Sequence, residues 1–213
     1  MITGKFPNLR LRRSRKNDWS RRLIEENNLT PSDFILPIFL IEGKNKKQKI
    51  ASMPGVYRYT LDKLASIVEK AIKSKIPMVA LFPHINNKNK NEFGTESLNE
   101  NNLVCKAIRL IKKKYKNEIG IMCDVALDIK EGADMVMVKP GLPYLDIIKS
   151  VKEKFKIPVM AYQVSGEYSL LENSINKKLV NKNVILESLI SFKRAGANAI
   201  VSYYADRLDK ILK

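Results

Sequence analysis

Short runs of apolar residues recur along the chain, and most contain the β-branched or aromatic residues that are typical of strands. These runs lie at residues 34–41, 78–82, 120–125, 133–138, 158–164 and 199–204. They are apolar almost throughout instead of alternating with polar residues, which indicates strands that are buried on both faces of a sheet. Pro37 interrupts the first run, although proline is unusual inside a central strand. The pattern predicts six buried strands.

Between these runs, apolar residues repeat with the period of a helix. The predicted helices cover residues 19–27, 61–73, 103–114, 144–155, 184–195 and 207–212. Residues 42–48 and 86–91 are polar and predict surface loops. Strand and helix therefore alternate almost throughout, which predicts an α/β fold with a parallel sheet covered by helices.

One connection breaks this alternation. Only the residues 126–132 separate the third predicted strand from the fourth. Parallel neighbours need a crossover of about a dozen residues or more, usually a helix, and this segment is too short to supply one. The stretch 127–131 followed by Gly132 resembles the last turn of a helix whose beginning is absent. We therefore expect that a segment is missing at this point.

Composition narrows the class of protein. With 213 residues, 45% of them hydrophobic, the chain is long enough to bury one sizeable core. Its apolar runs all fall short of the roughly 18 residues that a membrane span needs, so no membrane association is expected. Cys105 and Cys123 lie far apart without metal-type spacing, which argues against a disulfide framework and favours a cytoplasmic location.

The net charge of +17 raises the alternative of a basic nucleic-acid-binding protein. The lysines, however, are spread over every predicted helix, and the dense basic cluster is confined to residues 10–22. That cluster holds one aromatic residue, Trp19, and no recognisable zinc-finger or RNA-binding motif. An N-terminal arm that contacts another subunit explains the cluster as well as phosphate binding does.

Lys139 is the most informative candidate for chemistry. It ends the fourth apolar run, and Pro140 and Gly141 then break the strand. A partly desolvated lysine at the carboxyl end of a buried strand loses proton affinity and can attack a carbonyl group. The alternative is a lysine that merely ends a strand and reaches water along its stem. Spacing alone favours this second interpretation.

Polar residues also follow three other predicted strands: Asp124 after the third, Ser165 after the fifth, and Tyr203 at the end of the sixth. Each has an ordinary explanation, as a backbone partner, a turn residue or a ring tucked into the core. Together with Lys139 they suggest a carbonyl-binding amine surrounded by acid, hydroxyl and phenol groups. His84 follows a proline in a loop, and an incidental surface imidazole explains it better than a metal ligand does.

Several segments resemble one family in the same order along the chain. They are MVKPGLPYLD at 137–146, AYQVSGEY at 161–168, KRAGA at 193–197, SMPGV at 52–56, LFP at 81–83, and the arginine-rich start through LPIF at 36–39. MVKPGLPYLD resembles the Schiff-base lysine segment of porphobilinogen synthase, also called 5-aminolaevulinic acid dehydratase. The resemblance extends over essentially the whole chain and is specific to this family.

The resemblance implies a TIM-type (β/α)8 barrel with an N-terminal arm that embraces a neighbouring subunit, commonly in octamers. It implies the condensation of two 5-aminolaevulinate molecules, with loss of two waters, to porphobilinogen for haem and other tetrapyrroles. Lys139 would form the imine with the keto group of one substrate, and Ser165 and Tyr203 would bind a substrate carboxylate. Asp124 would transfer or orient a proton at the reaction centre.

The chain also departs from the family. Near residues 128–129 the resemblance passes from just after the third barrel strand of the family to just before its sixth. Six of the eight barrel strands therefore remain. The chain would consist of an arm at 1–32 and a shortened barrel at 33–213. The sequence Val-Ala-Leu-Asp at 125–128 resembles both the end of the third strand and the helix before the Schiff-base lysine in relatives. The fourth and fifth strands, a second Schiff-base lysine, the lid, the carboxylate-binding arginines and the usual magnesium-site acid are absent.

These departures lead to two further expectations. Ala126 and Asp128 replace the cysteines of zinc-dependent relatives, so zinc is not expected, whereas magnesium remains compatible with the family. Two close ammonium groups depress each other's proton affinity, so Lys139 without its partner should be protonated more fully and should be a weaker nucleophile. A catalytically impaired or inactive remnant of the enzyme is therefore the alternative function.

Overall fold

The computed structural model describes residues 16–84, 99, 101–123, 135–155 and 157–212. Its strands are β1 (Phe34–Leu40), β2 (Lys47–Lys49), β3 (Tyr57–Tyr59), β4 (Met78–Pro83), β5 (Gly120–Cys123), β6 (Val136–Val138), β7 (Val159–Tyr162) and β8 (Ala199–Val201). Its α-helices are α1 (Asp18–Leu23), α2 (Leu61–Lys73), α3 (Leu103–Tyr115), α4 (Leu145–Phe155), α5 (Ser165–Asn176), α6 (Asn183–Arg194) and α7 (Leu208–Ile211). Short 3₁₀ helices are η2 (Pro31–Asp33), η6 (Leu142–Tyr144) and η7 (Tyr203–Arg207).

The six predicted strands form one parallel sheet in the order β5-β4-β1-β8-β7-β6. The register brings Val138 of β6 beside Ala161 of β7, and Ala161 beside Ile200 of β8. Each carboxyl end therefore lies at the same edge of the sheet. The predicted α/β class and the six parallel strands are confirmed.

Within the described ranges, β5 and β6 stand at opposite ends of this sheet, and each pairs with one strand only. A closed barrel would need further strands between these two edges. The barrel is thus incomplete, as expected from the short connection. The junction predicted near 128–129 lies outside the described residues.

Pro37 is accommodated because its nitrogen faces a gap in the pairing of β1. The backbone groups of Ile35 and Ile41 point away from β4, because Ile35 accepts from Ser202 after β8 and Ile41 donates to Tyr59 of β3. Pro37 lies two residues after Ile35 on the same strand, so its backbone groups also point away from β4. On that side β8 pairs at residues 34–35 and β3 at residues 39–40. The missing N–H of Pro37 therefore removes no ladder hydrogen bond.

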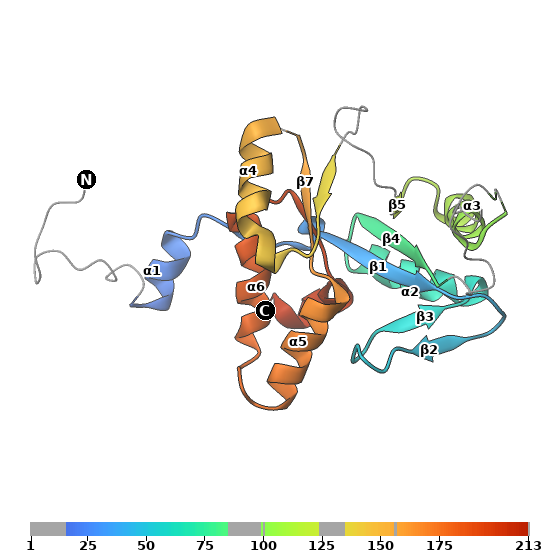
Figure 1. Cartoon of the computed structure of the whole chain (residues 1–213), viewed down its shortest axis with the longest axis horizontal. Helices are drawn as coiled ribbons and strands as arrows, with labels where there is room; N and C mark the ends of the chain where they lie inside the picture. Colours follow the sequence, from blue (N-terminus) through green and yellow to red (C-terminus); the bar gives the residue numbers. More distant parts are fainter. Residues whose placement is uncertain (1–15, 85–98, 100, 124–134, 156, 213) are drawn as a thin grey trace, which may run out of the picture.

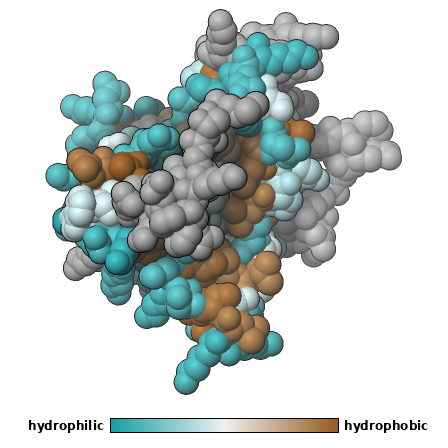
Figure 2. Space-filling model, turned by 90° about the vertical axis from the view of Figure 1, so that its left-hand side faces the viewer, coloured by the Kyte–Doolittle hydropathy of each residue, from teal (hydrophilic) through white to brown (hydrophobic). Residues whose placement is uncertain are grey.

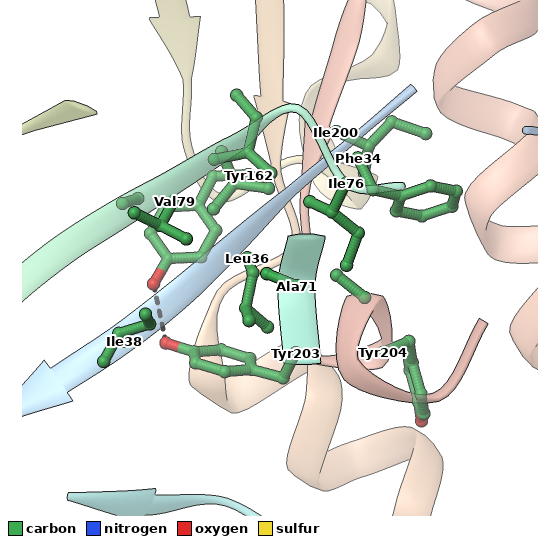
Figure 3. Close-up of a cluster of buried hydrophobic side chains, with 14 of the residues drawn as sticks. Phe34, Leu36, Ile38, Ala71, Ile76, Val79, Tyr162, Ile200, Tyr203 and Tyr204 are labelled. Atoms are coloured by element: carbon green, nitrogen blue, oxygen red, sulfur yellow. Dashed lines mark hydrogen bonds between the residues drawn. The ribbon is translucent and has the colours of Figure 1, made fainter. Parts of the chain in front are cut away.

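Helices pack on the sheet in two groups. α2 and α3 pack together and against β4, whereas α4 packs against β7 and α6 against β8 (Figure 1). α2 buries Leu64, Ile67, Val68 and Ala71, which recur with the helical period on one face of the helix. Phe34 and Ile38 of β1 lie in the resulting core together with side chains from β4 and β8 (Figure 3). The apolar periodicity thus accounts for both helix groups.

Several elements differ from the sequence prediction. β2 overlaps the end of the polar loop expected at 42–48 and forms an antiparallel pair with β3, a strand that the sequence did not predict. The three residues of β2 are all exposed and carry no apolar pattern. α5 was not predicted, because Ser165 and Gly166 indicate a turn and only Tyr168 and Leu171 of the helix are buried. β8 also ends at Val201, since the Ser202 hydroxyl accepts from Tyr204 N–H at 3.1 Å and begins η7.

The described start of the chain stands apart from the sheet. Figure 1 shows α1 projecting from the body on the side of α4 and α6. Two apolar side chains of this helix are left exposed, Trp19 at 62% and Leu23 at 77%. No helix in the described part of the chain combines the length and the apolarity required to cross a membrane.

Candidate active site

Lys139 directly follows β6, and its side chain is exposed. Because β6, β7 and β8 are adjacent parallel strands in register, the residues after them gather at one edge of the sheet. Ser165 begins α5 after β7, and Tyr203 begins η7 after β8. The structure therefore brings three of the four predicted site residues to one edge. The fourth, Asp124, lies outside the described residues.

The turn after Lys139 fits tightly against α6. A Cβ atom at Gly141 would lie 2.5 Å from Cε1 and 2.9 Å from Cζ of Phe192, and 3.0 Å from the carbonyl oxygen of Tyr162. The φ of Gly141 is −82°, which any residue adopts, so glycine is required here for space. The ring of Phe192 is fully buried. This packing fixes one side of the turn that follows the lysine.

The carboxylate of Glu167 holds the other side of that turn. It accepts hydrogen bonds from the backbone N–H groups of Gly141 at 3.2 Å and Leu142 at 2.6 Å. It also accepts from Val164 N–H at 2.7 Å, directly before Ser165. The turn after β6 and the turn after β7 are thus joined by one side chain. Sequence analysis assigned no role to Glu167, although its place three residues after Val164 is that of half a capping box.

Tyr203 points into the core, and its exposed fraction is 3%. Its hydroxyl lies 2.6 Å from that of Tyr162, a contact drawn as a dashed line in Figure 3. The ring stacks on Phe39 with centroids 5.6 Å apart, and Tyr162 stacks on Phe82 at 5.5 Å. Burial, together with the neighbouring phenol of Tyr162, raises the pKa of Tyr203 far above its usual range. Tyr203 is therefore a neutral phenol that can donate or accept a hydrogen bond.

The SMPGV segment at 52–56 is tied to the C-terminal part of the chain. The hydroxyl of Tyr168 donates to the carbonyl oxygen of Pro54 at 2.5 Å, and Arg207 donates to the same hydroxyl. Gly55 has a φ of +82°, which glycine adopts without strain, and a Cβ there would lie 3.5 Å from Nη2 of Arg207. These contacts explain why this segment can remain close-packed beside η7.

The described residues hold no group of three or more histidine, cysteine or acidic side chains arranged for a metal ion. His84 is exposed, in agreement with an incidental surface imidazole. Ala126 and Asp128, on which the prediction about zinc depends, lie outside the described residues. Magnesium therefore stays a prediction.

A parallel sheet covered by helices, with an amine, a hydroxyl and a phenol after three adjacent strands at one edge, is typical of barrel-type enzymes. The family described as delta-aminolevulinic acid dehydratase matches the chain at residues 8–129 and 125–211. The chain belongs to this family, whose enzymes, also called porphobilinogen synthases, are lyases of the dehydratase type.

Individual relatives align with nearly the whole length of this chain. The delta-aminolevulinic acid dehydratase of Bradyrhizobium diazoefficiens is 33% identical over 322 aligned positions, covering 96% of this chain and 91% of the relative. That of Methanothermus sociabilis is 27% identical over 317 positions, covering 96% and 98%. Both alignments are longer than the 213 residues of this chain, so a long stretch of each relative faces a gap.

A solved structure agrees as well. The enzyme from Toxoplasma gondii, in complex with its reaction product porphobilinogen, superposes with a TM-score of 0.83 at 25% identity. The superposition covers 95% of this chain and 91% of that one. The predicted resemblance is confirmed, and the matches give no support to a nucleic-acid-binding protein or to a remnant without activity.

Proposed function

We propose that the chain acts as a porphobilinogen synthase, condensing two 5-aminolaevulinate molecules to porphobilinogen with loss of two waters. The observation that carries the proposal is the position of Lys139 at the carboxyl end of β6, in the segment typical of the family's imine-forming lysine. Ser165 and Tyr203 follow the next two strands at the same edge. This grouping supports a site for a keto acid.

Lys139 supplies the nucleophile. The neutral amine attacks the keto carbon of one substrate, a C–N bond forms, and the carbonyl oxygen takes up a proton. The carbinolamine then loses this oxygen as water, and its two hydrogens derive formally from the amine. Condensation with the second substrate returns the amine of Lys139 and releases the second water, so that atoms balance over the cycle.

Ser165 and Tyr203 bind a carboxylate of the substrate, and Asp124 moves or orients a proton at the reacting atoms. A neutral phenol suits this task, because it donates a hydrogen bond to an anion without charge repulsion. The raised pKa of Tyr203 supports this role. Its hydroxyl must then share or exchange the bond with Tyr162 when the carboxylate binds.

The arm at 1–32 contacts a second copy in a homo-oligomer, and residues 33–213 form the shortened barrel. The exposed Trp19 and Leu23 of α1 support an apolar contact with another subunit. Figure 2, in which the side of α1 faces the viewer, shows brown apolar patches among teal polar atoms on this surface. A sedimentation measurement on the chain with and without residues 1–32 tests the assembly: deletion should reduce the oligomer to smaller species.

The missing barrel segment corresponds to a junction near 128–129. Residues 125–129 are matched by both parts of the family comparison, as expected if two similar stretches were joined. Sequencing of the genomic locus tests this proposal. An intact intervening sequence at the locus would contradict it.

Porphobilinogen formation from 5-aminolaevulinate tests the function directly. The purified chain should form the pyrrole, and Lys139→Met should abolish its formation. Lys149→Met, which removes an exposed lysine of α4, is the matched control and should leave the rate unchanged. If the wild-type chain forms a lysine adduct but no pyrrole, the impaired-remnant alternative is correct.

A further inference from the structure

Glu167 connects the two turns that carry Lys139 and Ser165. Its Oε1 accepts from Leu142 N–H, and its Oε2 accepts from both Gly141 N–H and Val164 N–H. Two of the donors follow the lysine by two and three residues, and the third directly precedes the serine. The separation of the two turns is therefore set by one carboxylate.

The chemistry of these donors makes the connection strong. Gly141 and Leu142 lie at the start of η6, which leads into α4, and Val164 is the N-cap of α5. Backbone N–H groups at a helix start lack partners within the helix and carry partial positive charge. An ionised acceptor forms roughly twice as strong a bond to such donors as a neutral one. A glutamine would present one oxygen and one NH₂ group, and the latter would face a donor.

The turn after Lys139 has little freedom on its other side. Gly141 lies against the buried ring of Phe192 and the carbonyl of Tyr162, at distances that exclude even a Cβ atom. Movement away from α6 is the direction left open, and the bonds to Glu167 oppose it. The amine of Lys139 therefore depends on Glu167 for its position relative to the hydroxyl of Ser165.

We infer that Glu167 is a positioning residue for the reaction: its carboxylate holds the turn of the imine-forming lysine at a fixed distance from the turn of the carboxylate-binding serine. This inference rests on the proposed function of Lys139. It assigns to Glu167 no contact with substrate. Its effect is on how often the bound keto group and the amine meet in a reactive geometry.

Glu167→Gln, Glu167→Asp and the control Glu172→Gln separate positioning from stability. Glu172 lies on the same helix, its side chain is only 13% exposed, and it pairs with Arg207 at 3.8 Å, so its loss tests a general weakening of α5. For each full-length protein, the rate at which sodium borohydride traps the 5-aminolaevulinate adduct on Lys139 is measured at saturating substrate, well below the unfolding temperature. Hydrogen exchange of the amides of Gly141 and Leu142 is followed in parallel.

Glu167→Gln should lower the trapping rate by about tenfold or more, towards the roughly hundredfold loss that an ångström-scale misplacement causes. It should also speed exchange at Gly141 and Leu142. Glu167→Asp, which retains both oxygens on a shorter stem, should recover part of the rate, and Glu172→Gln should match the wild type in both measurements.

Equal trapping rates in Glu167→Gln and Glu172→Gln would overturn the inference, as would unchanged exchange at the two amides. A wild-type chain that forms no adduct would contradict the proposed function instead. The exchange measurement would then still decide whether Glu167 joins the two turns.

Discussion

The two halves of the sheet are held together by different interactions. Around β7 and β8, buried polar side chains connect separate elements: Gln163 bonds both Ser188 of α6, at 3.2 Å, and Ser202, at 2.7 Å. Around β4 and β5, packing is mainly apolar, and the hydroxyl of Tyr115 on α3 donates to the carbonyl oxygen of Ala65 on α2 at 3.2 Å. The ion pair of Lys114 with Glu69 lies at the surface, with both side chains about half exposed. The described candidates for chemistry all lie in the first half.

The difference has a physical meaning. Apolar burial is non-directional and holds a sheet and its helices together without fixing the angle of a turn. Hydrogen bonds between buried groups are directional, and leaving one unmade is costly. The half with β6, β7 and β8 can therefore keep an amine, a hydroxyl and a phenol in register although β6 pairs with one strand only among the described residues. The largest effects on the site should come from changes in this half.

Gly141→Ala should have the largest effect on stability. The added methyl group would overlap the ring of Phe192, and overpacking of this kind costs about 3 kcal/mol. Urea unfolding of the single variants and of Gly141→Ala/Phe192→Leu measures the coupling, since leucine lacks the ring atoms that the methyl group meets. Free energies that simply add in the double variant would contradict a direct contact.

Ser188→Ala should cause the next largest loss of stability. It leaves the amide of Gln163 without its acceptor in the core, which costs about 1–3 kcal/mol. The matched change in the other half, Glu69→Gln, should have a smaller effect on the unfolding curve, because surface ion pairs contribute little and the glutamine oxygen can still accept from the Tyr115 hydroxyl. A greater loss in Glu69→Gln than in Ser188→Ala would remove the distinction between the two halves.

The ion pair of Asp33 with Lys193, at 2.5 Å, joins the end of η2 to α6 and predicts a pH effect. Burial opposes ionisation of Asp33, but the Lys193 ammonium and the Thr30 N–H outweigh it and lower the pKa of Asp33. A lowered folded-state pKa stabilises the protein above the unfolded-state value, and this contribution is lost as pH falls through the folded-state value. Below about pH 4, Asp33→Asn should therefore lose less stability than the wild type in urea titrations; parallel curves would argue against the pair.

Added zinc should have the smallest effect, since we expect no change in the rate of porphobilinogen formation. Positions 126 and 128 carry no thiolate, which zinc prefers as a ligand. After treatment with a chelator, added zinc should leave porphobilinogen formation unchanged, whereas added magnesium should restore any activity that the chelator removes. Activation by zinc would show a zinc site that the sequence does not predict.

The sequence predicts the parallel sheet well because each of its strands is an apolar run that needs burial on both faces. It could not predict β2, whose residues are all exposed and pair only through the backbone. α5 escapes prediction for a related reason: its first residues favour a turn, and its buried face is narrow.

The site was predicted less completely than the fold. Lys139, Ser165 and Tyr203 stand at strand ends, and the alternation of elements is enough to place them at one edge. Glu167 bonds the backbone of Leu142, 25 residues away in the sequence, and Tyr162 bonds Tyr203, 41 residues away. No local sequence pattern reveals such distant partners. The capping position of Glu167 predicts its bond to Val164 and leaves the two bonds to the lysine turn unforeseen.

The mass of the peptide that contains Lys139, after incubation with 5-aminolaevulinate and reduction by sodium borohydride, tests the central claim most directly. The account predicts a reduced substrate adduct on Lys139, and its rate of formation should fall in Glu167→Gln. An unmodified Lys139 in folded protein would contradict the account.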